Sequence, residues 1–197
     1  MMGGLIDGST VKGDIWKIES ANLSCGSIPT VVEGPGPRVG HASLLVGNAF
    51  IVFGGDTKVD ENDTLDDTLY LLNICKEQLK FHRVVSYADS SSFFFFFFPA
   101  FTASRQWSRS LPPSPRPTGR YGHTLNILGS KLYVFGGQVE GYFFNDLVAF
   151  DLNQLQNPAY KWELHIQNSH DGGPPPGEIP PARTNHTMVS FNDKLYL

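Results

Sequence analysis

Histidine is the side chain best suited to acid–base chemistry or metal binding near neutral pH, and three histidines occupy equivalent places in a repeated pattern. A catalytic residue normally occurs once in a site, whereas a residue that returns in every repeat is more often a structural hydrogen-bonding group. The spacing therefore predicts a scaffold role for these histidines. Each follows an arginine by three residues, in Arg38-Val39-Gly40-His41, Arg120-Tyr121-Gly122-His123 and Arg183-Thr184-Asn185-His186.

The arginines of the same motif carry the charge needed to bind an anion, for example in a channel lined by guanidinium groups. Because they recur together with the histidines, we expect structural partners instead. These would be backbone carbonyl groups or the carboxylates of a second recurring position, Asp14, Asp67 and Asp146. Anion binding stays open as the alternative.

Other constellations that could support catalysis are missing from the sequence. Cys25 and Cys75 have no histidine at motif spacing, no Gly-x-Ser-x-Gly element occurs, and the acidic stretch 56–67 lacks the central glycine of a calcium loop. We therefore expect no enzyme activity, no cofactor and no metal. The net charge of −4 gives no electrostatic argument for nucleic acid, and two distant cysteines suit a reduced intracellular compartment.

The elements that would position the recurring side chains are short β-hairpins. An aromatic-Gly-Gly triplet begins twelve residues after the first and second histidines, as Phe53-Gly54-Gly55 and Phe135-Gly136-Gly137. The glycine pair predicts either positive φ or the close approach of a neighbouring sheet, and no helix follows that would favour phosphate binding. A turn-forming pair flanked by apolar runs precedes each triplet, and it also follows the third histidine: Gly47-Asn48, Gly129-Ser130 and Asn192-Asp193.

Each hairpin is followed by further strand signals. A third strand is predicted at 14–18, 67–72 and 145–151, and a fourth, marked by tryptophan, at 106–109 and 161–166. The strands are apolar enough to predict sheets that are covered on both faces. A four-stranded antiparallel unit cannot cover both of its faces alone, so neighbouring units must stack side by side.

The order Arg-x-x-His, aromatic-Gly-Gly, Asn-Asp-Leu and Trp resembles the kelch repeat of β-propellers. The resemblance implies an all-β fold, a kelch-type β-propeller fragment of four-stranded antiparallel blades, with two blades near-complete and two partial. We expect the end of one blade at 1–27, a blade with an insert at 28–109, a blade at 110–166 and the start of another at 167–197. Met2-Gly3-Gly4 would then close an earlier copy, and the chain would stop one residue before a third Phe-Gly-Gly. The repeat-defining residues are Arg38, His41, Phe53, Gly54, Gly55, Arg120, His123, Phe135, Gly136, Gly137, Asp146, Trp162, Arg183 and His186.

Residues 119–147 are similar, more narrowly, to the kelch region of fungal cell-end polarity proteins. That resemblance implies a non-catalytic protein–protein interaction scaffold that helps to mark growth sites. Its partners would be polarity or cytoskeleton-linked proteins, and its location the cytoplasm, with the cell cortex or cell tip. The alternatives are a propeller enzyme, such as a galactose-oxidase-like oxidase or a glycan hydrolase, and a kelch ubiquitin-ligase substrate adaptor.

Partner binding is expected on the face where the 2–3 loops and the links between blades emerge. The 2–3 loops are predicted at 56–66 and 138–144, and the links at 28–37, 110–119 and 167–181. Tyr142, Phe143 and Phe144 place three rings in one of these loops, an arrangement typical of binding hot spots. The alternative is that one or two of the rings pack beneath the loop.

One stretch does not fit the repeat. The first two motif histidines are 82 residues apart and the next two are 63 apart, and the excess lies within about 74–103. This segment contains six consecutive phenylalanines, Phe93 to Phe98, which are too few to span a bilayer. Because phenylalanine codons are pyrimidine-rich, we interpret the insert as a translated intron rather than a hydrophobic anchor loop. Sequencing the transcript would test this.

Overall fold

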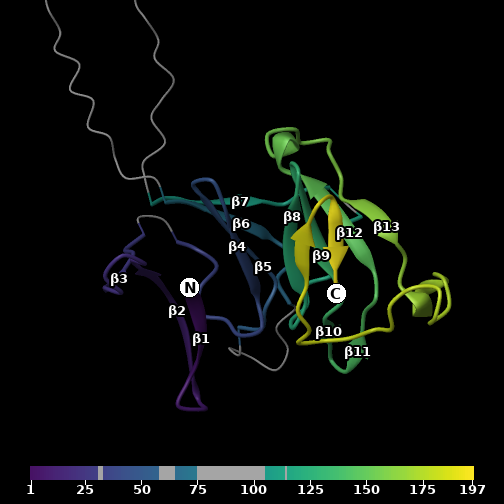
Figure 1. Cartoon of the computed structure of the whole chain (residues 1–197), viewed down its shortest axis with the longest axis horizontal. Coiled ribbons are helices and arrows are strands. Elements are labelled where there is room, and N and C mark those ends of the chain that lie inside the picture. The colour runs from purple at the N-terminus through teal and green to yellow at the C-terminus, as the bar shows by residue number, and fades with distance from the viewer. Residues whose placement is uncertain (31–32, 58–64, 75–104, 114) are drawn as a thin grey trace, which may run out of the picture.

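The computed structural model describes residues 1–30, 33–57, 65–74, 105–113 and 115–197, and these residues build an all-β architecture of stacked antiparallel sheets (Figure 1). The first blade has three strands, the second and third have four each, and the fourth is represented by one hairpin. In chain order they are β1 (Met2–Ile6), β2 (Thr10–Ile18) and β3 (Cys25–Ser27); β4 (Ala42–Val46), β5 (Ala49–Phe53), β6 (Leu69–Asn73) and β7 (Trp107–Ser110); β8 (Thr124–Leu128), β9 (Lys131–Phe135), β12 (Leu147–Asp151) and β13 (Glu163–Ile166); and β14 (Val189–Phe191) and β15 (Lys194–Tyr196).

Each blade is a simple meander in which consecutive strands pair side by side. The orders β4-β5-β6-β7 and β8-β9-β12-β13 confirm the predicted four-stranded antiparallel blades. The predicted two-residue turns are also confirmed, since Gly47-Asn48, Gly129-Ser130 and Asn192-Asp193 each connect two paired strands. The first residue of each turn has a positive φ, between 45° and 61°, which a tight hairpin turn requires.

Two features of the sheets differ from the expectation. Strand β3 in the first blade was not predicted, because Cys25, Gly26 and Ser27 give no apolar signal. Residues 138–144 were expected to be a loop, but β10 (Gln138–Val139) and β11 (Tyr142–Phe143) pair as a small hairpin. The glycine at its turn, Gly141, has a φ of 82°, so the backbone can reverse within two residues.

The hydrophobic core lies between blades rather than within one. One cluster joins the second and third blades, and a second cluster joins the first and second. Both faces of the second blade are therefore covered, as the uniformly apolar strands predicted. The first cluster contains Ile51, Phe53, Leu69, Leu125, Leu132, Val134, Val148, Phe150 and Trp162, and the second contains Met2, Ile15, Val52, Tyr70, Leu72 and Trp107.

The helical elements in the described residues are two short 3-10 turns, η1 (Leu152–Gln154) and η2 (Ser169–Asp171). Neither they nor any other described segment forms an apolar helix long enough to cross a bilayer. The phenylalanine-rich insert lies outside the described residues. The repeat boundaries at 27, 109 and 166 stay a prediction, and the strands of each blade fall within them except for Ser110, the last residue of β7.

Candidate functional site

The glycine pair at the end of the second strand forms the joint between neighbouring blades. A Cβ atom on Gly54 would lie 2.4 Å from the carbonyl oxygen of Arg120 and 2.5 Å from Cε1 of His123, both in the next blade. The N–H of Gly55 donates to that same Arg120 carbonyl at 2.8 Å. The pair therefore lets the next motif approach the strand end at hydrogen-bonding distance, which no larger residue would allow.

The same joint occurs at each of the three blade boundaries. The N–H of Gly137 donates to the carbonyl of Arg183 at 2.8 Å, and the N–H of Gly4 donates to the carbonyl of Arg38 at 3.1 Å. A Cβ on Gly136 would lie 2.9 Å from the Arg183 carbonyl oxygen, in the place that Gly54 occupies one blade earlier. Repetition of one set of contacts gives successive blades the same relative placement.

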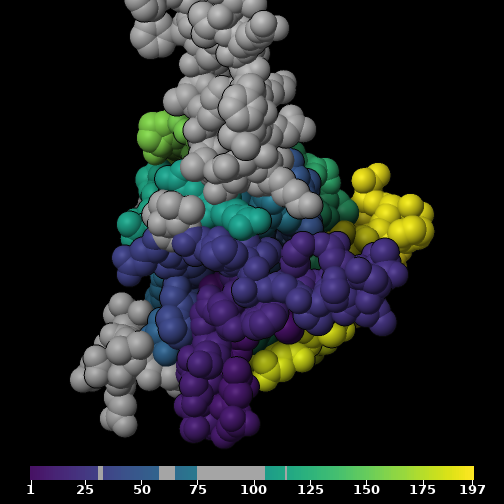
Figure 2. All heavy atoms as spheres, turned by 90° about the vertical axis from the view of Figure 1, so that its left-hand side faces the viewer, coloured from purple at the N-terminus to yellow at the C-terminus, as the bar shows by residue number. Residues whose placement is uncertain are grey.

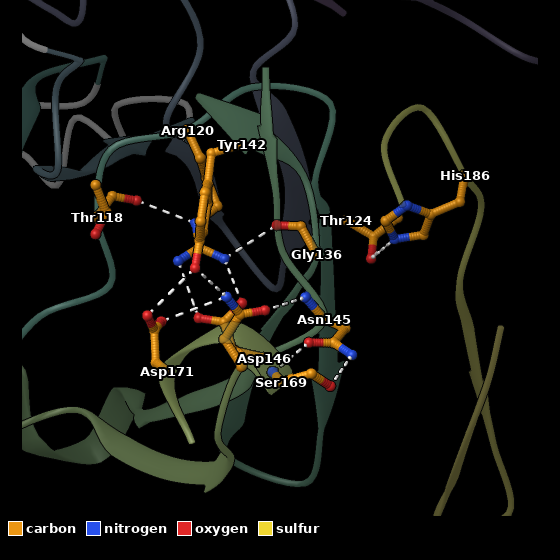
Figure 3. A network of polar contacts seen from close by, with 11 residues as sticks. Thr118, Arg120, Thr124, Gly136, Tyr142, Asn145, Asp146, Ser169, Asp171 and His186 are labelled. Atoms are coloured by element: carbon orange, nitrogen blue, oxygen red, sulfur yellow. Dashed lines mark hydrogen bonds and ion pairs between the residues drawn. The ribbon is translucent and has the colours of Figure 1, made fainter. Parts of the chain in front are cut away.

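The motif histidines pack their rings against the aromatic residue of the preceding triplet. His123 meets Phe53 edge-on, with ring centroids 5.4 Å apart, and His186 meets Phe135 in the same way at 5.5 Å. Nε2 of His186 lies 3.1 Å from Oγ1 of Thr124, within hydrogen-bond distance (Figure 3). The rings thus act as packing groups in the joint as well as polar ones.

His123 is the most deeply buried of the three histidines, and its two ring nitrogens have no hydrogen-bond partner among the described residues. The position equivalent to Thr124 in the preceding blade is Ala42, which has no hydroxyl group to offer. Burial lowers the pKa of His123 to about 3, and the nearby Arg120 charge adds to this, while the backbone of Phe53 partly offsets it. The ring is therefore neutral at physiological pH.

Acidification should destabilise the fold through His123. Its pKa is about 3 in the folded chain and 6.5 in the unfolded chain, so the unfolded state binds more protons between these values. The contribution of His123 to the free energy of unfolding is fully present above pH 6.5 and is lost as the pH drops toward 3. At pH 4.5 the loss from this residue alone is about 3 kcal/mol. Urea unfolding at pH 7 and pH 4.5 will show a smaller difference in His123→Gln than in the parent chain. An unchanged difference would contradict the assignment. His41→Gln should reduce the difference less, because His41 is less buried and its pKa is lowered mainly by that burial.

The recurring arginine of the third blade is fully occupied by partners within the protein (Figure 3). Nη1 and Nη2 of Arg120 donate to the two carboxylate oxygens of Asp146 at 2.6 and 3.0 Å. Nη1 also donates to the carbonyl of Gly136 at 3.0 Å, and Nε donates to that of Thr118 at 3.0 Å. The guanidinium carbon lies 4.1 Å from the ring centroid of Phe144. Arg120 therefore has a structural environment, with no free edge for an anion.

The other two motif arginines do not pair with the aspartates at the recurring position. Arg38 is buried and Nη2 lies 3.4 Å from Oδ2 of Asp66, not of Asp67 as expected from the sequence. Asp67 instead accepts from Nε of Arg116 at 2.9 Å. Leu69 pairs with Phe53 as Leu147 pairs with Phe135, so the position equivalent to Asp146 is Thr68 and no carboxylate stands there. Arg183 donates from Nε to the carbonyl of Pro181 at 3.0 Å. Asp14 accepts from the indole of Trp16.

Trp162 serves the core of the third blade. Its ring lies between Phe53 and Phe150, with ring centroids 5.7 and 5.3 Å away. Phe53 belongs to the second blade, so this tryptophan also ties the two blades together. The tryptophan of the preceding fourth strand, Trp107, is buried against Tyr70 in the equivalent place.

A polar network fixes the third-blade hairpin to the link that follows the blade (Figure 3). The hydroxyl of Tyr142 donates to Oδ1 of Asp171 at 3.2 Å and accepts from Nδ2 of Asn168 at 3.0 Å. Asn145 is buried, and its Nδ2 donates to Oγ of Ser169 at 2.8 Å. Desolvation, and after it the charge of Asp171, raises the pKa of Tyr142, so its hydroxyl stays protonated at neutral pH. The hairpin is thereby anchored at its base.

The three rings of this hairpin are divided between surface and interior. Tyr142 is 37% exposed and Phe143 is 41% exposed, whereas Phe144 is only 7% exposed and lies under the Arg120 guanidinium. Phe144, one of the three predicted partner-binding rings, is therefore too buried to contact a partner. Tyr142 and Phe143 are adjacent on β11, so their side chains leave opposite sides of the strand. The Tyr142 ring packs against Phe144 and His170, with ring centroids 5.2 and 5.4 Å away.

Sequence reasoning missed the residues that hold this hairpin. Asn145 could have been noticed because it precedes Asp146 in the recurring Asn-Asp-Leu, but Asn168 and Ser169 carry no repeated signal. Their roles depend on a link that folds back onto the blade, which spacing along the chain does not reveal.

The described residues contain no group of three or more His, Cys, Asp or Glu side chains placed to hold a metal ion. Cys25 is an exposed free thiol, and Cys75 lies outside the described residues. The polar clusters that the structure does describe, at Arg120 and at Asn145, are internally satisfied.

Comparison with known proteins agrees with the architecture. Residues 1–156 and 87–197 match the family model of the KLHDC2/KLHL20/DRC7 Kelch-repeats domain. The chain is 39% identical to Tip elongation aberrant protein 1 of Schizosaccharomyces pombe over 198 residues, which cover 100% of this chain and 14% of that protein. It is 40% identical to Kelch repeat-containing protein 2 of Saccharomyces cerevisiae over 205 residues, covering 99% of this chain and 19% of that protein. Host cell factor 1 of Homo sapiens is 24% identical over 200 residues, with 81% of this chain and 9% of that protein covered. The chain spans less than a fifth of the length of these curated relatives.

Proposed function

This chain belongs to the kelch-repeat family, and from that premise we propose that it is part of a non-catalytic scaffold that binds other proteins and serves growth polarity at cell ends. Binding takes place through the face formed by the 2–3 hairpins and the links between blades. The relatives support protein interaction as the general role, and the finer role in polarity is our proposal.

The observation that carries the proposal is the pair of exposed rings on the anchored third-blade hairpin. Tyr142 and Phe143 present aromatic surface, while the network through Asp171 and Asn168 holds the hairpin in place before any partner arrives. Rigid aromatic side chains lose little entropy on binding, which is why they often act as hot spots. The recurring arginines and histidines contact other residues at the joints between blades. Their structural role supports the assignment of partner binding to the exposed hairpin residues.

The expected partners are polarity or cytoskeleton-linked proteins, and the expected location is the cytoplasm beneath the cell cortex or at the cell tip. This part of the proposal rests on the likeness to Tip elongation aberrant protein 1, whose name refers to the elongation of tips. It concerns the whole protein, of which this chain would be the part that presents the loop face.

Replacing the exposed ring of Phe143 should uncouple the full-length protein from its partners. In cells that make the tagged protein, Phe143→Ser, which leaves the Tyr142 bonds to Asp171 and Asn168 in place, is expected to lower partner recovery at least about tenfold, since hot-spot truncation typically costs this much affinity. Quantitative mass spectrometry of the captured complexes measures the change, and fluorescence imaging measures enrichment at growing ends.

Leu164→Ser is the matched control, because Leu164 is an exposed apolar residue on β13 rather than on the hairpin. Protein level and thermal unfolding must stay at parent values in both variants. Unchanged partner recovery and unchanged enrichment at cell ends in the ring variant would refute the proposed function.

A further inference from the structure

Two hairpins on different blades are built alike. In the first blade, β1 and β2 meet at a turn that contains Asp7 and Gly8, with φ values of 54° and 71°. In the third blade, β10 and β11 meet at Glu140 and Gly141, with φ values of 47° and 82°. Each turn thus places a carboxylate followed by a glycine at its tip, in a tight left-handed geometry that holds the flanking residues in fixed positions.

Apolar side chains flank both tips and are exposed. Leu5 and Ile6 precede the first turn and are 53% and 45% exposed, and Tyr142 and Phe143 follow the other turn. Other strands also expose large apolar residues, for example Trp16, Leu164 and Phe191. These two pairs differ in flanking equivalent tips, and such an arrangement indicates a contact surface. Of these two pairs, only the third-blade pair was predicted from the sequence.

Both hairpins project from the same end of the stacked blades. Each follows the glycine pair of its blade, and the joint contacts of Gly4 with Arg38 and of Gly137 with Arg183 repeat the same geometry. In Figure 1 the turn between β1 and β2 and the turn between β10 and β11 both lie at the bottom of the molecule. Figure 2 views the first blade from outside and shows its purple hairpin at the lower end of the molecule.

The charges beside these apolar side chains are mostly negative. Asp7, Glu140 and Asp171 are exposed at or beside the tips. The exposed bases nearby are Lys12 and His170, and Lys17 lies toward the end of β2 far from the turn. Asp171 also lies within hydrogen-bond distance of the Tyr142 hydroxyl, so the negative charge adjoins an exposed ring. The buried Arg120 does not offset this field, because it is paired with Asp146.

We propose that the two tips form one docking surface for a basic peptide segment that carries large apolar side chains. The apolar residues of the segment contact Leu5, Ile6, Tyr142 and Phe143, and its lysine or arginine side chains face the carboxylates at the turns. The proposal rests on the proposed function and adds the chemistry of the partner and a second contact point. An acidic segment, an anionic lipid surface or a nucleic acid would be repelled by the same carboxylates.

Selection from an unbiased library of 15-residue peptides displayed on phage tests the proposal with the whole 197-residue chain as bait. Such peptides extend to about 50 Å, longer than a small domain is wide, so their length does not prevent contact with both tips. We expect the selected peptides to be rich in Lys or Arg together with Phe, Leu or Trp. Affinities of synthetic copies are then measured by fluorescence anisotropy against a set of variants at two salt concentrations.

Leu5→Ser with Ile6→Ser, and separately Phe143→Ser, should each weaken binding at least about tenfold at both salt concentrations. Asp7→Asn with Glu140→Gln keeps the shape of the turns, and it should weaken binding at low salt and remove most of the salt dependence. Leu164→Ser is the apolar control and should leave affinity unchanged. Circular dichroism and melting temperature establish that each variant folds as the parent does.

The outcomes separate this proposal from the proposed function. Selected peptides without basic character, or binding that depends on Phe143 but not on Leu5 and Ile6, would overturn the two-tip basic-segment proposal and leave the protein-binding scaffold standing. Selected peptides that are insensitive to every one of these variants would overturn both.

Discussion

Asp146→Asn will destabilise the chain by about 3–5 kcal/mol, because it leaves the buried guanidinium of Arg120 without its counter-charge. Both carboxylate oxygens of Asp146 accept from Arg120, and the arginine side chain is only 1% exposed. The carbonyls of Gly136 and Thr118 would still accept from the arginine, but they carry no net charge. For a chain of this size the loss corresponds to a fall in melting temperature of roughly 10 °C, measured by circular dichroism at pH 7.

Asp67→Asn supplies the matched comparison, since it removes the same charge from an arginine-paired aspartate near the surface. The pair of Asp67 with Arg116 has side chains 33% and 25% exposed, and such pairs contribute about 0–1 kcal/mol. A loss in Asp146→Asn no larger than that in Asp67→Asn would show that burial of the Arg120 pair is energetically unimportant.

The strand framework was predictable from the sequence because its signals are local. A turn pair such as Gly129-Ser130, short apolar flanks and a closing Phe-Gly-Gly all lie within about fifteen residues of one histidine, and their repetition removed the ambiguity between helix and strand. The all-β class, the four-stranded blades and the kelch family followed from these signals and are confirmed.

Pairings between distant residues were less predictable. The sequence placed Asp67 in register with Asp146, but strand pairing puts Thr68 at that position, and Arg38 lies beside Asp66 instead. Strand β3 was missed since Cys25-Gly26-Ser27 has neither an apolar pattern nor a tryptophan. A short edge strand of this kind is specified by the strand beside it rather than by its own residues.

The candidate site could be predicted only in part from the sequence. Three adjacent aromatic residues give the same signal in sequence, although their side chains point to different sides of the backbone. Phe143 and Phe144 follow one another along the chain, and Phe144 turns inward beneath Arg120 while Phe143 stays exposed. The first-blade tip went unnoticed because Leu5 and Ile6 read as ordinary strand residues. Their exposure, 53% and 45%, is not marked by any feature of the local sequence.

Gly54→Ala will cost stability on the same scale as the loss of the buried ion pair, because the added methyl group has no room in the joint. The new Cβ would lie 2.4 Å from the Arg120 carbonyl oxygen and 2.5 Å from Cε1 of His123, both well inside van der Waals contact. Gly54 also has a φ of 67°, which alanine adopts at a cost of about 1–2 kcal/mol. Overpacking adds about 1–3 kcal/mol, so we expect a total loss of about 2–5 kcal/mol.

Gly129→Ala separates the backbone cost from the joint itself. Gly129 has a φ of 61°, close to that of Gly54, but its Cβ position has no atom within 4 Å. This variant should lose about 1–2 kcal/mol, the backbone share alone. Urea unfolding of the two variants at pH 7 gives the difference directly. If the two losses were equal, the contact between the glycine pair and the next arginine would contribute nothing, and the blades would have to be held together by the apolar core alone.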